Sequence, residues 1–192
     1  MKKKRAKDVI MSVVLVLSIV LLCFTGIGCG EEEGTANGGV YIIGHDAVDS
    51  GGHCDIDYSQ SRYARRIETG IDTWNAYKSV LRKESAFVIQ DVTITDTFNM
   101  KVSWSGQTTF LLDDNGKFSG KATVEYNTYH LESESYTENN VLHTVMHELG
   151  HLLGLNENNT GLKSSIMRQG QLENTKLSAD DKASFDKAAE LY

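Results

Sequence analysis

The sequence predicts an α+β domain with a mixed, twisted sheet, a long N-terminal helix, a central helix and a C-terminal helix. Short β-branched or alternating runs in the middle of the chain are typical of strands. Two helical patterns follow them, from about Glu138 to Leu153 and from Ser178 onward. The long helix is predicted from apolar residues that recur every three or four positions after Ser59, namely Tyr63, Ile67, Ile71, Trp74, Tyr77 and Leu81.

The predicted strands are separated by polar segments, and no proline interrupts them. A polar, glycine-containing loop is expected from His45 to Asp57, and the residues DDNG at 113–116 predict a turn. We expect strands at Val40–Ile43, Phe87–Thr95, Met100–Trp104, Thr108–Leu112 and Lys121–Tyr126.

The two later helices carry signals for their ends. Thr137 is suited to be the N-cap of the central helix, and Gly154 is suited to end it. The run from Ser178 to Asp181 has the pattern of a capping box ahead of the apolar Phe185. We therefore expect the chain to fold as one domain over residues 40–192.

The first 39 residues are predicted to lie outside this domain. A basic stretch from Met1 to Lys7 precedes an apolar run from Val9 to Gly28, which is the pattern of a signal segment over residues 1–29. Three alternatives stay open: a lipoprotein signal with Cys29 lipidated, an uncleaved membrane anchor, or free secretion. Each places the domain outside the cytoplasm, at the cell surface or secreted, and residues 30–39 read as a flexible tether.

The charge and cysteine content exclude some partners. Residues 1–28 hold five of the 19 basic residues and one of the 26 acidic ones, so the rest of the chain has a formal charge of −11. Such a surface repels phosphate backbones, so we expect no nucleic-acid partner. Cys54 has no second cysteine beyond residue 29 to pair with, and we expect a monomer. Asp113 and Asp114 are compatible with Ca²⁺, but the spacing fits no EF-hand.

The chemistry lies in the run His147-Glu148-Leu149-Gly150-His151. Residues four apart lie on one face of a helix, so both imidazoles can bind one zinc ion. Glu148 lies beside them, where its carboxylate can take a proton from metal-bound water. The alternative is a pair of histidines on a helix surface without a metal.

At these residues the sequence resembles the metzincin metallopeptidases, and their matrixin branch in particular. The family pattern HExxHxxGxxH is matched from His147 through Gly154, and Glu157 stands in place of the third histidine. Residues 164–167 (SSIM) look like the family's methionine turn around Met167. The segment from Leu177 to Tyr192 resembles the helix that closes matrixin catalytic domains.

The resemblance implies a catalytic Zn²⁺ and a zinc-dependent endopeptidase that acts on proteins or peptides. The expected ligands are His147, His151 and Glu157, with Glu148 as general base and Met167 beneath the metal. Glu173 is the alternative third ligand, in the manner of peptidases that use a more distant glutamate. The resemblance also suggests that an extended substrate adds as a strand beside Lys121–Tyr126. A non-catalytic zinc-binding surface lipoprotein is the competing function.

Several other residues invite a role. His143 precedes His147 by one helical turn, and we expect it to be a hydrogen-bonded neighbour. Cys54 is expected to be an unpaired structural or intermolecular thiol, with a zinc-capping role as the alternative. His45, His53 and His130 are expected in loops or on the surface. Residues 168–170 (RQG) depart from the family pattern after the methionine, which leaves the shape of the substrate pocket open.

Overall fold

The computed structural model describes residues 39–83, 90–114 and 118–192. The predicted signal segment and nearly all of the predicted tether lie outside the described residues, so they stay predictions. The same holds for the first residues of the predicted strand Phe87–Thr95 and for part of the predicted turn at 113–116. In the described part of the chain, no helix is both long enough and apolar enough to cross a bilayer.

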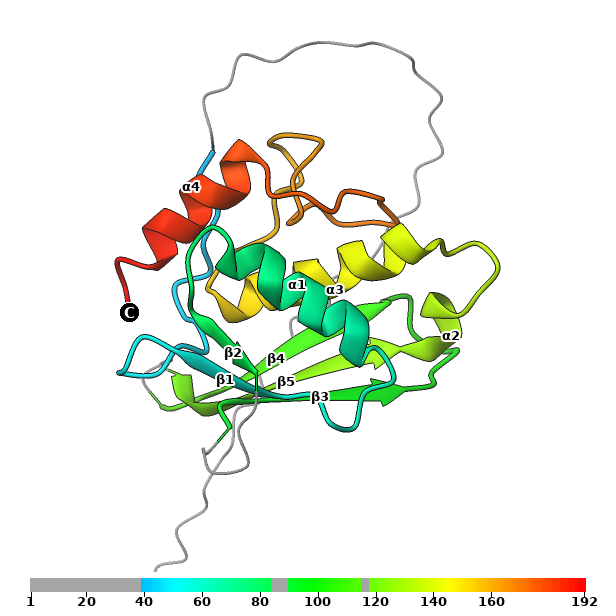
Figure 1. The fold of residues 1–192 in the computed structure, drawn as a ribbon, viewed down its shortest axis with the longest axis horizontal. Helices are drawn as coiled ribbons and strands as arrows, with labels where there is room; N and C mark the ends of the chain where they lie inside the picture. The colour runs from blue at the N-terminus through cyan, green and yellow to red at the C-terminus, as the bar shows by residue number, and fades with distance from the viewer. Residues whose placement is uncertain (1–38, 84–89, 115–117) are drawn as a thin grey trace, which may run out of the picture.

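A five-stranded mixed sheet forms the floor of the domain (Figure 1). Its spatial order is β2-β1-β3-β5-β4, and all neighbours are parallel except the antiparallel pair of β4 and β5. β5 is therefore paired on both sides, whereas β4 forms an edge. The strands span Cys54–Asp57 (β1), Leu81–Lys83 (β2), Val92–Thr97 (β3), Gly106–Leu112 (β4) and Phe118–Asn127 (β5).

The helices α1 (Ala64–Asn75) and α3 (Glu138–Leu152) lie on the same face of the sheet (Figure 1). A Cβ on Gly70 of α1 would lie 2.8 Å from a methyl carbon of Leu149, so the glycine permits this close approach. Trp74 closes the contact by donating an indole hydrogen bond to the Met146 carbonyl at 3.0 Å. A short helix, α2 (Thr128–Leu131), and the C-terminal α4 (Ala179–Ala188) complete the domain.

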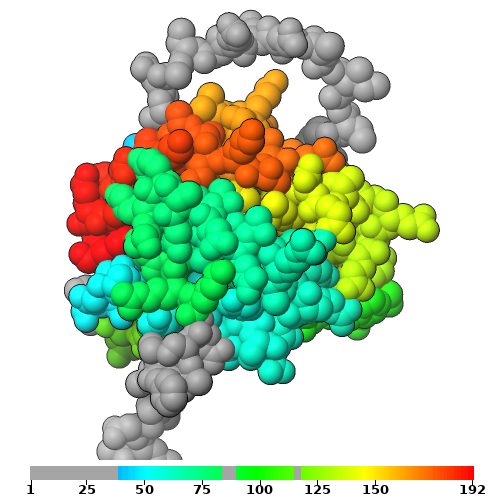
Figure 2. Space-filling view, viewed as in Figure 1, coloured from blue at the N-terminus to red at the C-terminus, as the bar shows by residue number. Residues whose placement is uncertain are grey.

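The core lies between the helices and one face of the sheet. Val92 and Ile94 of β3 are buried and Thr93 between them is exposed, and β5 alternates in the same way. This alternation leaves the second face of the sheet polar, because successive strand residues point to opposite sides. Figure 2 shows α1 on the surface of the helical face, with the segment between α3 and α4 above it and α4 to one side.

The end signals of both later helices are confirmed. Thr137 and Ser178 are N-caps, and each forms a capping box with the residue three positions later. Gly154 has a φ of 84°, the left-handed conformation that ends α3 and that a residue with a Cβ adopts only under strain.

Three predictions about strands were wrong. Val40–Ile43 is no strand of the sheet, since Ile42 forms only an isolated bridge with Leu155. The predicted loop from His45 to Asp57 contains β1, which lies between β2 and β3. Aspartate has a low strand propensity, so the two aspartates of β1 made this segment resemble a loop. Met100–Trp104 is irregular, and Met100 is 66% exposed because no neighbouring strand pairs with this run.

The long helix is shorter than its apolar spacing predicted. α1 ends at Asn75, Tyr77 is 38% exposed, and Leu81 begins β2. The side chain of Asn75 explains the end, because its oxygen accepts hydrogen bonds from the backbone N–H groups of Val80 and Leu81, both at 3.1 Å. The chain is thereby turned from the helix into the strand.

Candidate metal centre

Helix α3 positions two histidine rings on one side. His147 and His151 are four residues apart, and their Nε2 atoms lie 3.2 Å from each other. Each ring is fixed through its other nitrogen: Nδ1 of His147 lies 2.9 Å from the Ile166 carbonyl oxygen, and Nδ1 of His151 lies 2.9 Å from that of Leu155. Carbonyls accept only, so both Nδ1 atoms donate, and the Nε2 atoms are the ring nitrogens that face each other.

The turn at Gly154 brings the third side chain to the histidines. Leu155 donates its N–H back to the Gly150 carbonyl at 3.1 Å, so the chain reverses as α3 ends. The N-terminal segment holds the turn from outside, because Ile43 donates to the Gly154 carbonyl and Asn156 donates to that of Tyr41, both at 2.9 Å. Glu157 follows this turn and points back at the helix.

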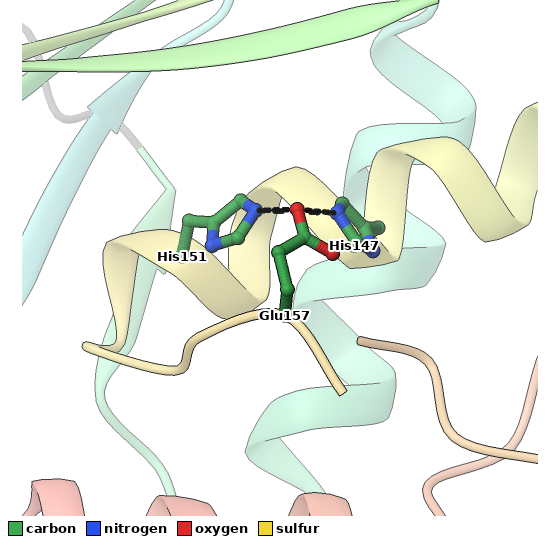
Figure 3. A group of neighbouring side chains, drawn as sticks. All are labelled: His147, His151 and Glu157. Carbon is green, nitrogen blue, oxygen red and sulfur yellow. Dashed lines mark hydrogen bonds and ion pairs between the residues drawn. The ribbon is translucent and has the colours of Figure 1, made fainter. Parts of the chain in front are cut away.

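The three side chains converge on one point (Figure 3). Oε1 of Glu157 lies 3.4 Å from Nε2 of His147 and 3.5 Å from Nε2 of His151. A tetrahedral zinc ion with ligand bonds of about 2.1 Å separates its ligand atoms by about 3.4 Å. The three edges of this triangle therefore fit three corners of a zinc tetrahedron.

The charges within the cluster also fit a cation. The second carboxylate oxygen of Glu157 is buried and has no hydrogen-bond partner among the described residues. Burial by itself would raise the pKa of Glu157, but hydrogen bonds and charge from the two histidines lower it to about 2. Burial would likewise lower the pKa of His147, and Glu157 raises it to about 9. The carboxylate of Glu157 is thus held ionised beside the two rings.

Glu148 lies next to the cluster and is oriented by strand β4. Its Oε2 accepts a hydrogen bond from the Thr108 hydroxyl at 2.7 Å. A Cβ on Gly106 would lie 2.8 Å from Oε1 of Glu148, so the glycine lets the edge strand pass close to this carboxylate. Oε1 accepts no hydrogen bond from the described residues.

The turn at residues 164–167, which the sequence predicts as a methionine turn, packs against α3. Met167 is buried, and a Cβ on Gly150 would overlap its sulfur, so the turn fits closely against α3. The carboxylate of Asp181 in the first turn of α4 accepts hydrogen bonds from the Ile166 N–H at 3.0 Å and from the Ser165 hydroxyl. α4 therefore fixes the carbonyl of Ile166 that in turn orients His147.

A cleft of about 990 Å³ is lined by His147, His151 and Glu157 and by the neighbouring Glu148. The residues of β4 line one side of it, and residues 101–105 and 168–171 contribute to the rest. The predicted substrate position beside Lys121–Tyr126 was wrong: β5 is paired with β3 and β4, so its backbone is already used. The free edge at the cleft belongs to β4.

The structure places the remaining sequence candidates away from the three converging atoms. The two ring nitrogens of His143 lie 2.9 and 3.2 Å from the carbonyls of Asn174 and Arg168. Glu173 is exposed and accepts a hydrogen bond from Thr137 at the start of α3, ten residues before His147. Cys54 is buried in β1, where burial raises the pKa of its thiol. His45 is partly buried against Phe110 at the cleft.

Sequence reasoning missed three residues that support the site. Thr108 stood in a predicted strand, but nothing in its local pattern shows that it contacts Glu148. Asp181 was recognised as part of a capping box, and its second role at the methionine turn depends on a contact across 15 residues. Gly106 is a glycine in a strand, which often marks a place where another group approaches the backbone closely. Its sequence context does not show that this group is Glu148.

The comparisons with known proteins show similarity of fold. No protein-family model matches the chain, and no curated protein matches it in sequence. The solved structure of myroilysin matches with 15% identity and a TM-score of 0.50, covering 79% of this chain and 98% of myroilysin. The GM1-bound form of the ECX AB5 holotoxin matches with 16% identity over 80% of this chain and 78% of that one, at a lower TM-score of 0.41. The described domain therefore has an α+β fold similar to that of myroilysin.

Proposed function

We propose that this chain is a zinc-dependent endopeptidase whose metal ligands are His147, His151 and Glu157. The observation that carries the proposal is the convergence of two Nε2 atoms and one carboxylate oxygen, 3.2 to 3.5 Å apart, beside the carboxylate of Glu148. Three protein ligands leave one position of a tetrahedral ion for water or substrate, which is the arrangement of catalytic zinc.

Zinc bound there would lower the pKa of its water and polarise the carbonyl of the scissile peptide bond. The residues of the chain do the rest. Thr108 holds Oε2 of Glu148, so Oε1 is the atom that accepts a proton from the attacking water and passes it to the leaving amine. The carbonyls of Ile166 and Leu155 keep the two histidines from rotating during this transfer.

The free edge of β4 supports an extended peptide as substrate. Within the described residues β4 pairs only with β5, so its other edge offers backbone donors and acceptors along the cleft. A peptide that adds to this edge as a strand gains affinity from the main chain and selectivity from side-chain pockets. The cleft volume of about 990 Å³ is near the upper end of small-ligand pockets, which suits several peptide residues on both sides of the bond.

The test is cleavage of a mixed peptide library by the full chain with zinc supplied. Glu148→Gln keeps the size of the side chain but removes the base, so we expect bound zinc to be retained and cleavage to fall about 10²–10⁴-fold. Glu190→Gln is the matched control, because Glu190 is exposed after α4, pairs with Lys187 at the surface and does not line the cleft, and its cleavage should equal that of the wild type.

Equal cleavage by wild type and Glu148→Gln would contradict the proposed role of Glu148. If neither protein cleaves any peptide while both bind one zinc ion, the competing function, a non-catalytic zinc-binding protein, is favoured. Zinc content should be measured on every sample, so that loss of metal is distinguished from loss of the base.

A further inference from the structure

The charge of the cleft differs from the charge of the rest of the protein. Residues 29–192 have a formal charge of −11, yet among the described residues that line the cleft the only acids are Glu148 and Glu157, both at the candidate metal centre. Besides the histidines, two basic side chains line it, those of Lys101 and Arg168. Away from the metal centre, the ionised side chains of the cleft are therefore cationic.

Both cations lie on the side of the metal centre that faces the start of α3. Nε2 of His143, one helical turn before the first histidine of the metal centre, lies 3.2 Å from the carbonyl oxygen of Arg168. The segment from Lys101 to Ser105 reaches the same end of the cleft, because the hydroxyl of Ser105 is hydrogen-bonded to that of Tyr136, just before the N-cap of α3. A ligand at this end therefore meets both cations.

The opposite end of the cleft is apolar. Its lining includes Ile42, Ile43, Phe110 and Leu112. The N–H of Ile43 donates to the carbonyl of Gly154, which follows α3, so this end lies beyond the C-terminus of the helix. A peptide that lies along the cleft thus contacts basic side chains on one side of the metal centre and apolar side chains on the other.

Arg168 has a fixed backbone and an unpaired side chain. His143 holds its carbonyl, and the N–H of the next residue, Gln169, donates to Oδ1 of Asn159 at 3.1 Å. The side chain is half-buried, and its guanidinium forms no hydrogen bond or ion pair with any described residue. A guanidinium carries five N–H donors in a rigid fork that matches a carboxylate. A carboxylate that enters the cleft here displaces no protein partner.

We infer that the cleft selects peptides with an acidic residue on one side of the cleaved bond, and that Arg168 binds its carboxylate. The inference rests on the proposed peptidase function and names its substrate class. Arg168 is half-buried, so a charge-assisted, bidentate pair with it is strong. Lys101 is exposed, and a pair at the surface contributes little, so its part is the smaller one.

The distance along the helix limits where the acidic residue lies. The carbonyl of Arg168 is placed one turn before His147, and one turn of an α-helix rises about 5.4 Å. An extended peptide rises about 3.3 Å per residue. We therefore expect the acidic residue about one to three positions from the cleaved bond, and apolar residues on the opposite side of that bond.

The overall negative charge of the protein does not prevent this selection. At physiological ionic strength charges are screened over about 8 Å, so acids elsewhere on the surface act weakly on a peptide in the cleft. A carboxylate in contact with the half-buried Arg168 is screened much less. The nearest cation therefore decides which peptides bind.

The test compares two peptides that differ only by Glu or Gln at the acidic position found most often in the cuts of the mixed library. We expect the full, zinc-loaded chain to cleave the Glu peptide with a kcat/KM about 10- to 100-fold higher. In Arg168→Gln this ratio should fall below about threefold, while cleavage of the Gln peptide stays within about twofold of the wild type. The control Arg65→Gln, on the exposed face of α1 and outside the cleft lining, should keep the wild-type ratio.

Two further variants separate the fork from the charge. Arg168→Lys keeps the positive charge without the bidentate fork, so we expect it to retain part of the preference for Glu, and it serves if Arg168→Gln does not fold. Arg168→Glu should reverse the preference, in favour of a third peptide with Lys at the same position. Lys101→Gln should lower the ratio less than about threefold, because the side chain is exposed.

Binding of the same peptides to the zinc-loaded Glu148→Gln chain distinguishes this inference from the proposed function. Cleavage without a preference for Glu, or a preference that persists in both Arg168→Gln and Arg168→Glu, overturns the inference and leaves the peptidase function intact. If no peptide is cleaved but the Glu peptide binds more tightly, and adding Arg168→Gln abolishes the difference, the acidic selection is supported and the peptidase function fails. Equal binding of both peptides without cleavage overturns both.

Discussion

Two groups of histidine, aspartate and glutamate side chains converge among the described residues, and they are built differently. In the cluster of His147, His151 and Glu157, both histidines are oriented through their second nitrogen by backbone carbonyls that follow α3. In the second group, Asp49, Asp55 and Asp91, which we call the aspartate cluster, backbone N–H groups of Gly51, His53 and Asp55 hold two of the carboxylates. The first cluster mixes nitrogen and oxygen donors around a cleft, whereas the second offers oxygen alone.

The two clusters also differ in their access to the cleft. The histidine cluster lies beside a free strand edge and a second carboxylate, so a substrate can reach the position that the ligands leave open. The aspartate cluster lies at the start of two parallel strands, and the cleft residues do not include it. Three substitutions break or sharpen this comparison, and we give them from the largest expected effect to the smallest.

Glu157→Gln should have the largest effect, because it removes the only anionic ligand of the histidine cluster. We expect zinc affinity to fall on the order of 10³-fold, beyond the 10–100-fold typical of an outer-shell partner. Zinc titration against a competing chelator measures this. Glu173→Gln is the matched control and should bind zinc like the wild type, since Glu173 is bonded to Thr137 at the far end of α3. Zinc loss in Glu173→Gln alone would reverse the assignment of the third ligand.

Asp181→Asn tests the support beneath the histidine cluster. Its carboxylate accepts the N–H groups of Ile166 and Ser178 at 3.0 and 2.7 Å. Hydrogen bonds to a charged group contribute about 1.5–3 kcal/mol each, so we expect the free energy of unfolding to fall by about 2–4 kcal/mol. Urea denaturation measures it.

The control is Asp186→Asn on the same helix. Asp186 is exposed and pairs with Lys78, and its loss should cost less than about 1 kcal/mol. Equal destabilisation by the two variants would show that the hydrogen bonds from Asp181 to the turn at residues 164–167 contribute no more to the free energy of unfolding than a surface ion pair does.

Thr108→Val should have the smallest effect and should change only the rate of cleavage. Valine keeps the shape of threonine but cannot donate to Oε2 of Glu148. Loss of one hydrogen bond of about 1–1.5 kcal/mol corresponds to roughly tenfold slower cleavage, with zinc affinity unchanged. Thr108→Ser retains the hydroxyl and should restore most of the rate. Slow cleavage by both variants would mean that the strand surface, and not the hydroxyl, positions Glu148.

Local signals in the sequence were sufficient where an element depends on its own residues. The N-cap at Thr137, the glycine at 154 and the helical spacing between them are all contained within α3, so the helix could be predicted together with the shared face of His147 and His151. The capping box at Ser178 predicted α4 for the same reason. Helix signals are local because the hydrogen bonds of a helix join residues four apart.

Strands were predicted less well, because their partners come from elsewhere in the chain. Asp55 and Asp57 made β1 look like a loop, and its place between β2 and β3 overrides their low strand propensity. Met100–Trp104 has the pattern of a strand but no neighbour to pair with in the described sheet. The order of the strands, which makes β4 the free edge at the cleft, is likewise absent from any local window.

By itself the sequence determined the two helices that carry and support the candidate metal centre, and the pair of histidines with Glu148 between them. Only the tertiary structure decided that Glu157 lies with the histidines and Glu173 does not, that β4 orients Glu148, and that three aspartates from separate segments meet. Spacing along a helix fixes which side chains share a face. Contacts between distant segments are fixed instead by the packing of the whole core, which no short stretch of sequence contains.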